Sequence, residues 1–78
     1  MKYYALRLKQ GGQYYSHIHI SDDKEVVIST PHIQRAKWFD NYDWQSKDGK
    51  ELYRVKDLLE EQRISSYIVV VKIDVWEL

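Results

Sequence analysis

Hydrophobic and polar residues alternate through residues 3–9 and again through residues 13–20, and this period of two is typical of strands with one buried face. Gly11 and Gly12 separate the two runs and tolerate the positive φ angles of a tight hairpin turn. The pattern therefore predicts a β-hairpin. Its buried face is expected to hold Tyr4, Leu6 and Leu8 from the first strand and Tyr14, Ile18 and Ile20 from the second.

The next segment predicts a third strand and a short helix. Residues 25–29 are a β-branched run that suits a strand paired in a three-stranded meander. Thr30 can cap a helix whose first position is Pro31, where the missing N–H costs nothing. Apolar residues then recur at helical spacing, so we expect a helix over residues 31–39.

A longer helix and a last strand complete the predicted elements. Asp48 and Glu51 have the spacing of a capping box, and the apolar stripe behind them predicts a helix that ends near Arg63. Residues 67–77 are rich in β-branched side chains and predict a strand inside the sheet. Its helix-facing residues are expected to be Val69, Val71 and Ile73.

These elements predict an α+β fold of the order β-β-β-α-α-β in one domain over residues 1–78. The expected architecture is a small antiparallel sheet of four strands. Both helices are expected to pack on one face, which leaves the other face of the sheet open.

Composition excludes several classes of function but does not identify one. The 78 residues include no Cys, which excludes disulfides and thiolate metal sites, and 12 Lys plus Arg balance 12 Asp plus Glu. A net charge of zero gives no field that would draw nucleic acid or an anionic membrane, and this mildly favours a protein partner. The longest apolar run, residues 67–71, is too short to cross a bilayer, so we expect a cytoplasmic protein without a cofactor.

No catalytic motif stands out. The serines lack the context of a nucleophile elbow and the glycines do not form a phosphate loop, so we expect a protein that is not an enzyme. His17 and His19 lie on one side of a strand, and His32 could be a third ligand. We expect these histidines to be surface residues that bind no metal, and a histidine metal site is the alternative.

The open face of the sheet is the first candidate surface. Aromatic and cationic side chains would gather there, which suits a protein interface. Single-stranded nucleic acid is the alternative ligand, because bases stack on such rings. The expected surface comprises Tyr3, Arg7, Tyr15, His17, His19, Lys72 and Trp76.

A second candidate surface lies between the two predicted helices, where residues 38–44 hold four large rings. So small a core cannot bury all four, so we expect Phe39 and one tryptophan to pack inside. The remaining rings, among Trp38, Tyr42 and Trp44, would form an exposed aromatic patch flanked by Asp40, Asp43 and Asp48, which suits a basic protein surface. A loop folded over the core as a lid is an equal alternative.

Residues 29–40 follow a Gly-Gly-Gln-Tyr-Tyr hairpin and contain Ala36-Lys37-Trp38-Phe39. This layout resembles small uncharacterised proteins of Gram-positive bacteria and their phages. The resemblance implies a hairpin, a strand, a helix with the Ala-Lys-x-Phe pattern, a longer helix and a last strand in a phage or prophage setting, and it assigns no activity and no functional residues.

The sequence thus predicts a small interaction module that binds a host or self protein through one of these two surfaces. Single-strand nucleic-acid binding is the first alternative and a histidine metal site the second. A homodimer that covers the open face is also left open.

Overall fold

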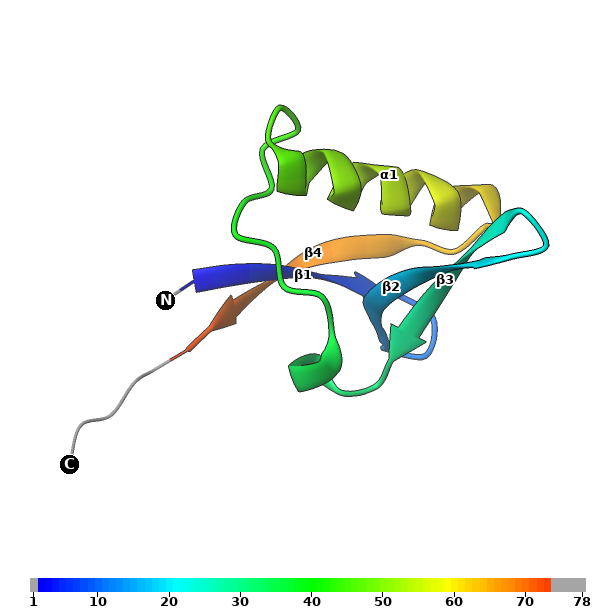
Figure 1. Cartoon of the computed structure of the whole chain (residues 1–78). Helices are drawn as coiled ribbons and strands as arrows, with labels where there is room; N and C mark the ends of the chain where they lie inside the picture. The colour runs from blue at the N-terminus through cyan, green and yellow to red at the C-terminus, as the bar shows by residue number, and fades with distance from the viewer. Residues whose placement is uncertain (1, 74–78) are drawn as a thin grey trace.

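The computed structural model describes residues 2–73 and shows an α+β fold with a curled antiparallel sheet of four strands and one α-helix (Figure 1). The helix α1 lies over one face of the sheet. The elements are β1 (Lys2–Leu8), β2 (Tyr14–Ser21), β3 (Lys24–Thr30), the 3-10 helix η1 (Ile33–Arg35), α1 (Lys47–Glu61) and β4 (Ser66–Lys72). No helix in the described part of the chain has the length and apolar content to cross a membrane.

The strands are arranged in the order β3-β2-β1-β4, so the predicted meander of the first three strands is confirmed. The prediction that the last strand lies inside the sheet is wrong, because β4 is an edge strand that pairs with β1 alone. The apolar residues on both sides of β4 reflect partial burial of both faces of this strand. Coverage of the faces carries no information about whether both edges are paired.

A segment after β3 fills the opening between β1 and β2, which pair with each other only near their hairpin turn, at Arg7 and Tyr14. Phe39 forms a bridge with β1: the Tyr4 N–H donates to the Phe39 carbonyl at 2.8 Å and the Phe39 N–H donates to the Tyr4 carbonyl at 2.7 Å. On the other side, the Lys37 N–H donates to the Tyr15 carbonyl at 2.9 Å. The chain therefore crosses from η1 to α1 through the sheet in an extended conformation (Figure 1).

The predicted helix over residues 31–39 is therefore wrong, and only the single turn η1 forms. The backbone groups of Lys37 and Phe39 that a helix would pair internally are bonded to β2 and β1 instead. η1 also lies on the side of the sheet opposite α1, so the expectation of two helices on one face is not met (Figure 1). The indole N–H of Trp38 donates to the Ile33 carbonyl at 2.8 Å and holds this turn.

A β-bulge in β2 changes which residues face the helix. The register with β3 shifts between Tyr15 and His17, so Ser16 is the extra residue. Tyr15 is consequently 3% exposed in the core, and Ile18 packs against the same core. Tyr14 pairs with Arg7 and lies on the opposite face, so the predicted orientations of Tyr14 and Tyr15 are wrong.

The register of β4 is also the reverse of the prediction. Ile68 pairs with Leu6 and packs against the core, whereas Val69 pairs with Ala5 on the other face. Val71 likewise pairs with Tyr3 on that face, so neither valine faces the helix. The core between sheet and helix comprises Leu6, Leu8, Tyr15, Phe39, Leu52, Val55 and Leu59.

The ends of α1 are built by local hydrogen bonds. The Ser46 hydroxyl is the N-cap and accepts the Gly49 N–H at 2.9 Å, so the cap lies two residues before the predicted Asp48. At the other end, the Ile64 N–H donates to the Leu59 carbonyl at 2.9 Å, and Arg63 between them has a φ of 62°. This is a Schellman motif, and the predicted end near Arg63 is confirmed.

Candidate interaction surface

The loop before α1, residues 40–46, is shaped by its own side chains. Asn41 accepts the Asp43 N–H at 2.8 Å through its side-chain oxygen, and Asp43 accepts the Gln45 N–H at 3.0 Å through its carboxylate. The Ser46 hydroxyl donates to the Asp43 carbonyl at 2.6 Å. Consecutive Asx-type turns of this kind fix a backbone without regular secondary structure. The loop therefore presents its exposed residues from a defined backbone.

Two contacts attach this loop to α1. The Asp40 N–H donates to the Asp48 carboxylate at 2.7 Å, so the acidic residue that was expected as the cap ties down the loop instead. Gly49 lies directly beneath the turn, and a Cβ added at this position would be 1.8 Å from the Asp43 carbonyl oxygen. Only glycine allows this approach. The position of Asp43 thus depends on a residue within the first turn of the helix.

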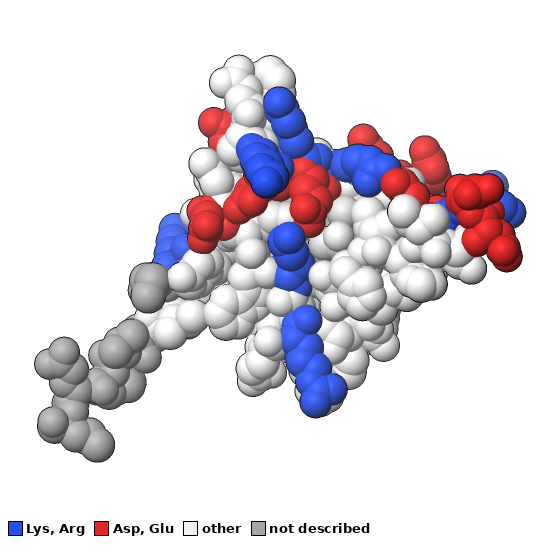
Figure 2. All heavy atoms as spheres, in the orientation of Figure 1, with Lys and Arg blue, Asp and Glu red and all other residues white. Residues whose placement is uncertain are grey.

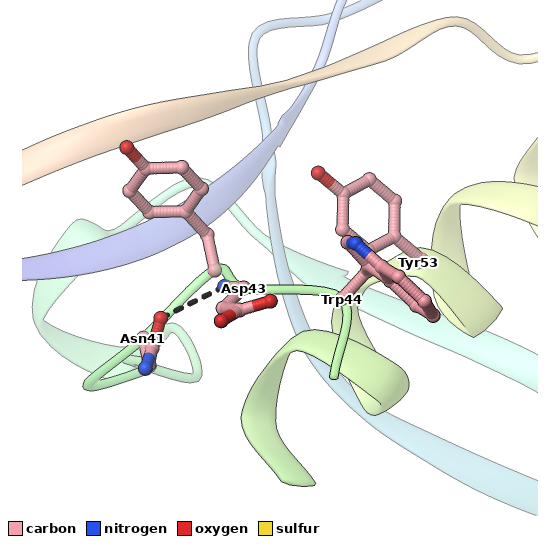
Figure 3. A pocket seen from close by; sticks show the side chains of 5 residues that line it. Asn41, Asp43, Trp44 and Tyr53 are labelled. Atoms are coloured by element: carbon pink, nitrogen blue, oxygen red, sulfur yellow. Dashed lines mark hydrogen bonds between the residues drawn. The ribbon is translucent and has the colours of Figure 1, made fainter. Parts of the chain in front are cut away.

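The loop and α1 enclose a surface pocket of about 430 Å³ (Figure 3). We call it the aromatic pocket; its lining residues are Asn41, Tyr42, Asp43, Trp44 and Tyr53. Tyr53 reaches it from α1, and Asp43 lies between Asn41 on one side and Trp44 with Tyr53 on the other. The exposed fraction is 68% for Trp44, 49% for Tyr42 and 38% for Tyr53. Three large rings are thus accessible around one depression.

The apolar surface continues from the aromatic pocket to the edge of the sheet. The Tyr42 ring meets the Tyr4 ring edge to face, with centroids 4.7 Å apart and planes at 68°. Tyr4 is paired with Val70 on β4, and 49% of Val70 is exposed. The edge-to-face contact supports Tyr42 from below and links the pocket to β4.

Among the residues that the structure describes, Asp43 is the only charged one that lines the aromatic pocket. Three charged residues of α1 have partners outside the pocket: Glu51 lies 3.5 Å from the Lys37 ammonium, Arg54 pairs with Glu25, and Lys56 donates to the Ser66 carbonyl at 2.8 Å. In Figure 2 charged side chains gather over α1 and at the turn between β2 and β3, whereas the tip of the loop before α1 is uncharged. The pocket therefore combines exposed rings with a single negative charge.

Two of the three rings predicted for the second candidate surface are exposed in the structure. Phe39 is fully buried and Trp38 is half-buried, as expected for one phenylalanine and one tryptophan packed inside. Tyr42 and Trp44 are exposed. Trp38 is separated from them, because its ring packs against Tyr3 with centroids 5.6 Å apart. The patch of Trp38, Tyr42 and Trp44 is thus reduced to its last two rings.

The first candidate surface is not assembled. Tyr15 lies in the core, and Tyr3 is half-buried beside Trp38. Ala5 is fully buried on the face opposite α1, so that face is covered there and is not open. Arg7 is half-buried, with its guanidinium carbon 5.6 Å from the centroid of the Tyr14 ring.

The remaining predicted residues of that face are scattered. His17 and His19 are exposed on the side opposite α1. Lys72 pairs with Lys2 and, by alternation along β1, lies on the same side as Tyr4, which faces the core. Trp76 lies outside the described residues. Within residues 2–73, no group of three or more His, Asp or Glu side chains is placed to hold a metal ion.

Tyr53 and Asn41 are pocket residues that sequence reasoning missed. Tyr53 does carry a signal, because it follows Leu52 on α1 and falls outside the buried stripe of Leu52, Val55 and Leu59. An aromatic residue on the polar side of an amphipathic helix is expected to be exposed. Nothing in the sequence marks Asn41 beyond its place in a polar turn.

A comparison with models of protein families finds no match, and neither does one with curated proteins or with solved structures. The resemblance to small proteins of Gram-positive bacteria and their phages stays a prediction. Function is therefore inferred from the surface itself.

Proposed function

We propose that this protein is a small, non-catalytic interaction module that binds a protein partner through the aromatic pocket. The observation that carries the proposal is the exposure of Trp44 and Tyr42 beside Tyr53 around one depression. Trp and Tyr are enriched among the residues that dominate binding energy at protein interfaces. An exposed tryptophan in a polar turn contributes nothing to the core, so its burial by a partner is the simplest use for it.

The defined loop backbone supports the same proposal. Hydrogen bonds from Asn41, Asp43 and Ser46 hold the turn, and Gly49 lets it rest on α1. A surface that is already ordered loses little conformational entropy when a partner binds. Rigid aromatic side chains on such a loop are the arrangement that binding loops commonly use.

The proposed partner presents a basic segment. Asp43 is the one charge in the lining, and a positive group on the partner would meet it across the pocket. Two basic residues of α1, Arg54 and Lys56, interact with Glu25 and with the Ser66 carbonyl. A cationic segment would thus meet Asp43 without displacing either of them.

Selection from a random peptide library against the full chain tests this proposal. Trp44→Ser is the test variant and Ile20→Ser is its matched control, because Ile20 is also 68% exposed but lies at the end of β2. We expect selected peptides to be enriched in Lys or Arg and to lose about tenfold or more in affinity with Trp44→Ser, as for an interface anchor. They should bind Ile20→Ser like the wild type.

Equal binding of the selected peptides to the wild type and Trp44→Ser would contradict the proposal. Selected peptides that are acidic would contradict the basic partner. Circular dichroism of both variants checks that each retains the fold, which is expected because both side chains are exposed.

A further inference from the structure

The chemistry of the aromatic pocket is more specific than that of a general hydrophobic contact. Its lining contains one indole, two phenols, one carboxylate and one amide. The face of an aromatic ring carries a partial negative charge, so rings and carboxylate favour the same kind of ligand, a cation. Within residues 2–73, no positively charged side chain lines the pocket to compete with it.

The hydrogen bonds already made by the pocket's polar side chains bear on which class of cation the pocket would bind. One oxygen of the Asp43 carboxylate already accepts the Gln45 N–H at 3.0 Å. A guanidinium binds a carboxylate best when both oxygens accept its parallel N–H groups, and an ammonium needs acceptors for three donors. The Asn41 side-chain oxygen also accepts an N–H already, so the lining offers a cation a negative charge but few further acceptors for N–H donors.

A quaternary ammonium fits these conditions. It carries a full charge without N–H donors, and its methyl groups contact aromatic faces, which is how aromatic cages bind such ligands. Trp gives the strongest cation–π interaction among the aromatic residues, and Trp44 is the most exposed ring of the pocket. A pocket of about 430 Å³ has ample room for one such group.

We propose that the aromatic pocket binds the trimethylated ammonium group of a lysine side chain on the partner, held by Tyr42, Trp44 and Tyr53 with Asp43 supplying the counter-charge. This inference rests on the proposed function and names the group that the partner inserts. Tyr42 is placed for this role by its contact with Tyr4, and Tyr53 by the helix.

Four synthetic peptides that differ at one position test the proposal. That position carries trimethyllysine, its uncharged tert-butyl isostere, lysine or arginine, and binding to the full chain is followed by the shift of the Trp44 indole N–H signal in NMR spectra. We expect saturable binding of the trimethyllysine peptide and about tenfold weaker binding of the uncharged isostere, since only charge separates the two. Lysine and arginine are expected to bind more weakly than trimethyllysine.

Variants of the protein place the binding in the pocket. Asp43→Asn keeps an oxygen for the Gln45 N–H and removes the charge, so it should weaken the trimethyllysine peptide about threefold and leave the isostere unchanged. Asp57→Asn, which removes an exposed acid that does not line the pocket, is the control and should change neither.

Equal affinity for the trimethyllysine peptide and its isostere would overturn the proposal, as would tightest binding of the arginine peptide or no saturable shift at all. These outcomes are distinct from a failure of the proposed function. If library-selected peptides still require Trp44 while this series shows no preference for the quaternary ammonium, the interaction module stands and the assignment of its ligand falls.

Discussion

Tyr15 was predicted to lie on the open face of the sheet but lies in the core. Its ring is 3% exposed and stacks near Phe39, with centroids 6.3 Å apart. Burial raises the pKa of the Tyr15 hydroxyl to about 12, and the negative charge of Glu51 and a hydrogen bond to it add to the effect. The sequence marks Tyr15 as a strand residue, but one extra residue at Ser16 decides its face.

The raised pKa of Tyr15 predicts a loss of stability in alkali. In the unfolded chain this hydroxyl ionises near pH 10, whereas in the folded chain it stays protonated until about pH 12. The unfolded state thus binds fewer protons in that window, and the free energy of unfolding should fall by about 2 to 3 kcal/mol as pH rises through it. Below about pH 9 the contribution of Tyr15 is constant.

Urea unfolding of the wild type and Tyr15→Phe at a series of pH values measures this contribution. Other groups that titrate in alkali remain in both proteins, so the difference between the two curves isolates Tyr15. The wild type should lose more stability than Tyr15→Phe above about pH 10. Parallel curves through the whole alkaline range would show that Tyr15 does not carry the effect.

At the scale of elements, the sequence predicts those helices and turns that depend on local residue patterns. It does not predict segments whose conformation depends on pairing with distant strands. The hairpin at Gly11 and Gly12, which both have positive φ, and the long helix are confirmed. The helix over residues 31–39 is wrong, because its backbone is used by β1 and β2. Spacing of apolar residues cannot distinguish a short helix from an extended segment that is threaded between two strands.

The C-terminus of α1 gives a prediction at this scale. Arg63 has a φ of 62°, a left-handed conformation that costs a non-glycine residue about 1 kcal/mol. Arg63→Gly should therefore raise the free energy of unfolding by about 0.5 to 1 kcal/mol, as measured by urea unfolding.

Arg63→Ala is the matched control, since it removes the same charge but keeps a Cβ in the left-handed conformation. It should not be more stable than the wild type. The prediction fails if Arg63→Gly and Arg63→Ala have the same stability, because the backbone conformation would then not be the source of the effect.

At the scale of the whole molecule, the candidate site joins segments that are far apart in the sequence. Tyr4 supports Tyr42, and Tyr53 on α1 faces the loop that carries Trp44. The sequence identifies the surplus of rings over core capacity but leaves open which tryptophan packs inside, and the structure places Tyr42 and Trp44 outside the core. The sequence cannot bring Tyr53 to them, because that depends on how the loop folds back on α1 at Asp48 and Gly49.

The central claim is that the surface around Trp44 is where a partner binds. Photo-crosslinking tests it most directly: a photoreactive phenylalanine replaces Gln45, the exposed neighbour of Trp44, in one protein and the exposed Ile20 in another, so that Trp44 itself is kept. With library-selected peptides as ligands, we predict efficient crosslinks from position 45 and background levels from position 20. Crosslinks of equal yield from both positions, or from position 20 alone, would contradict the claim.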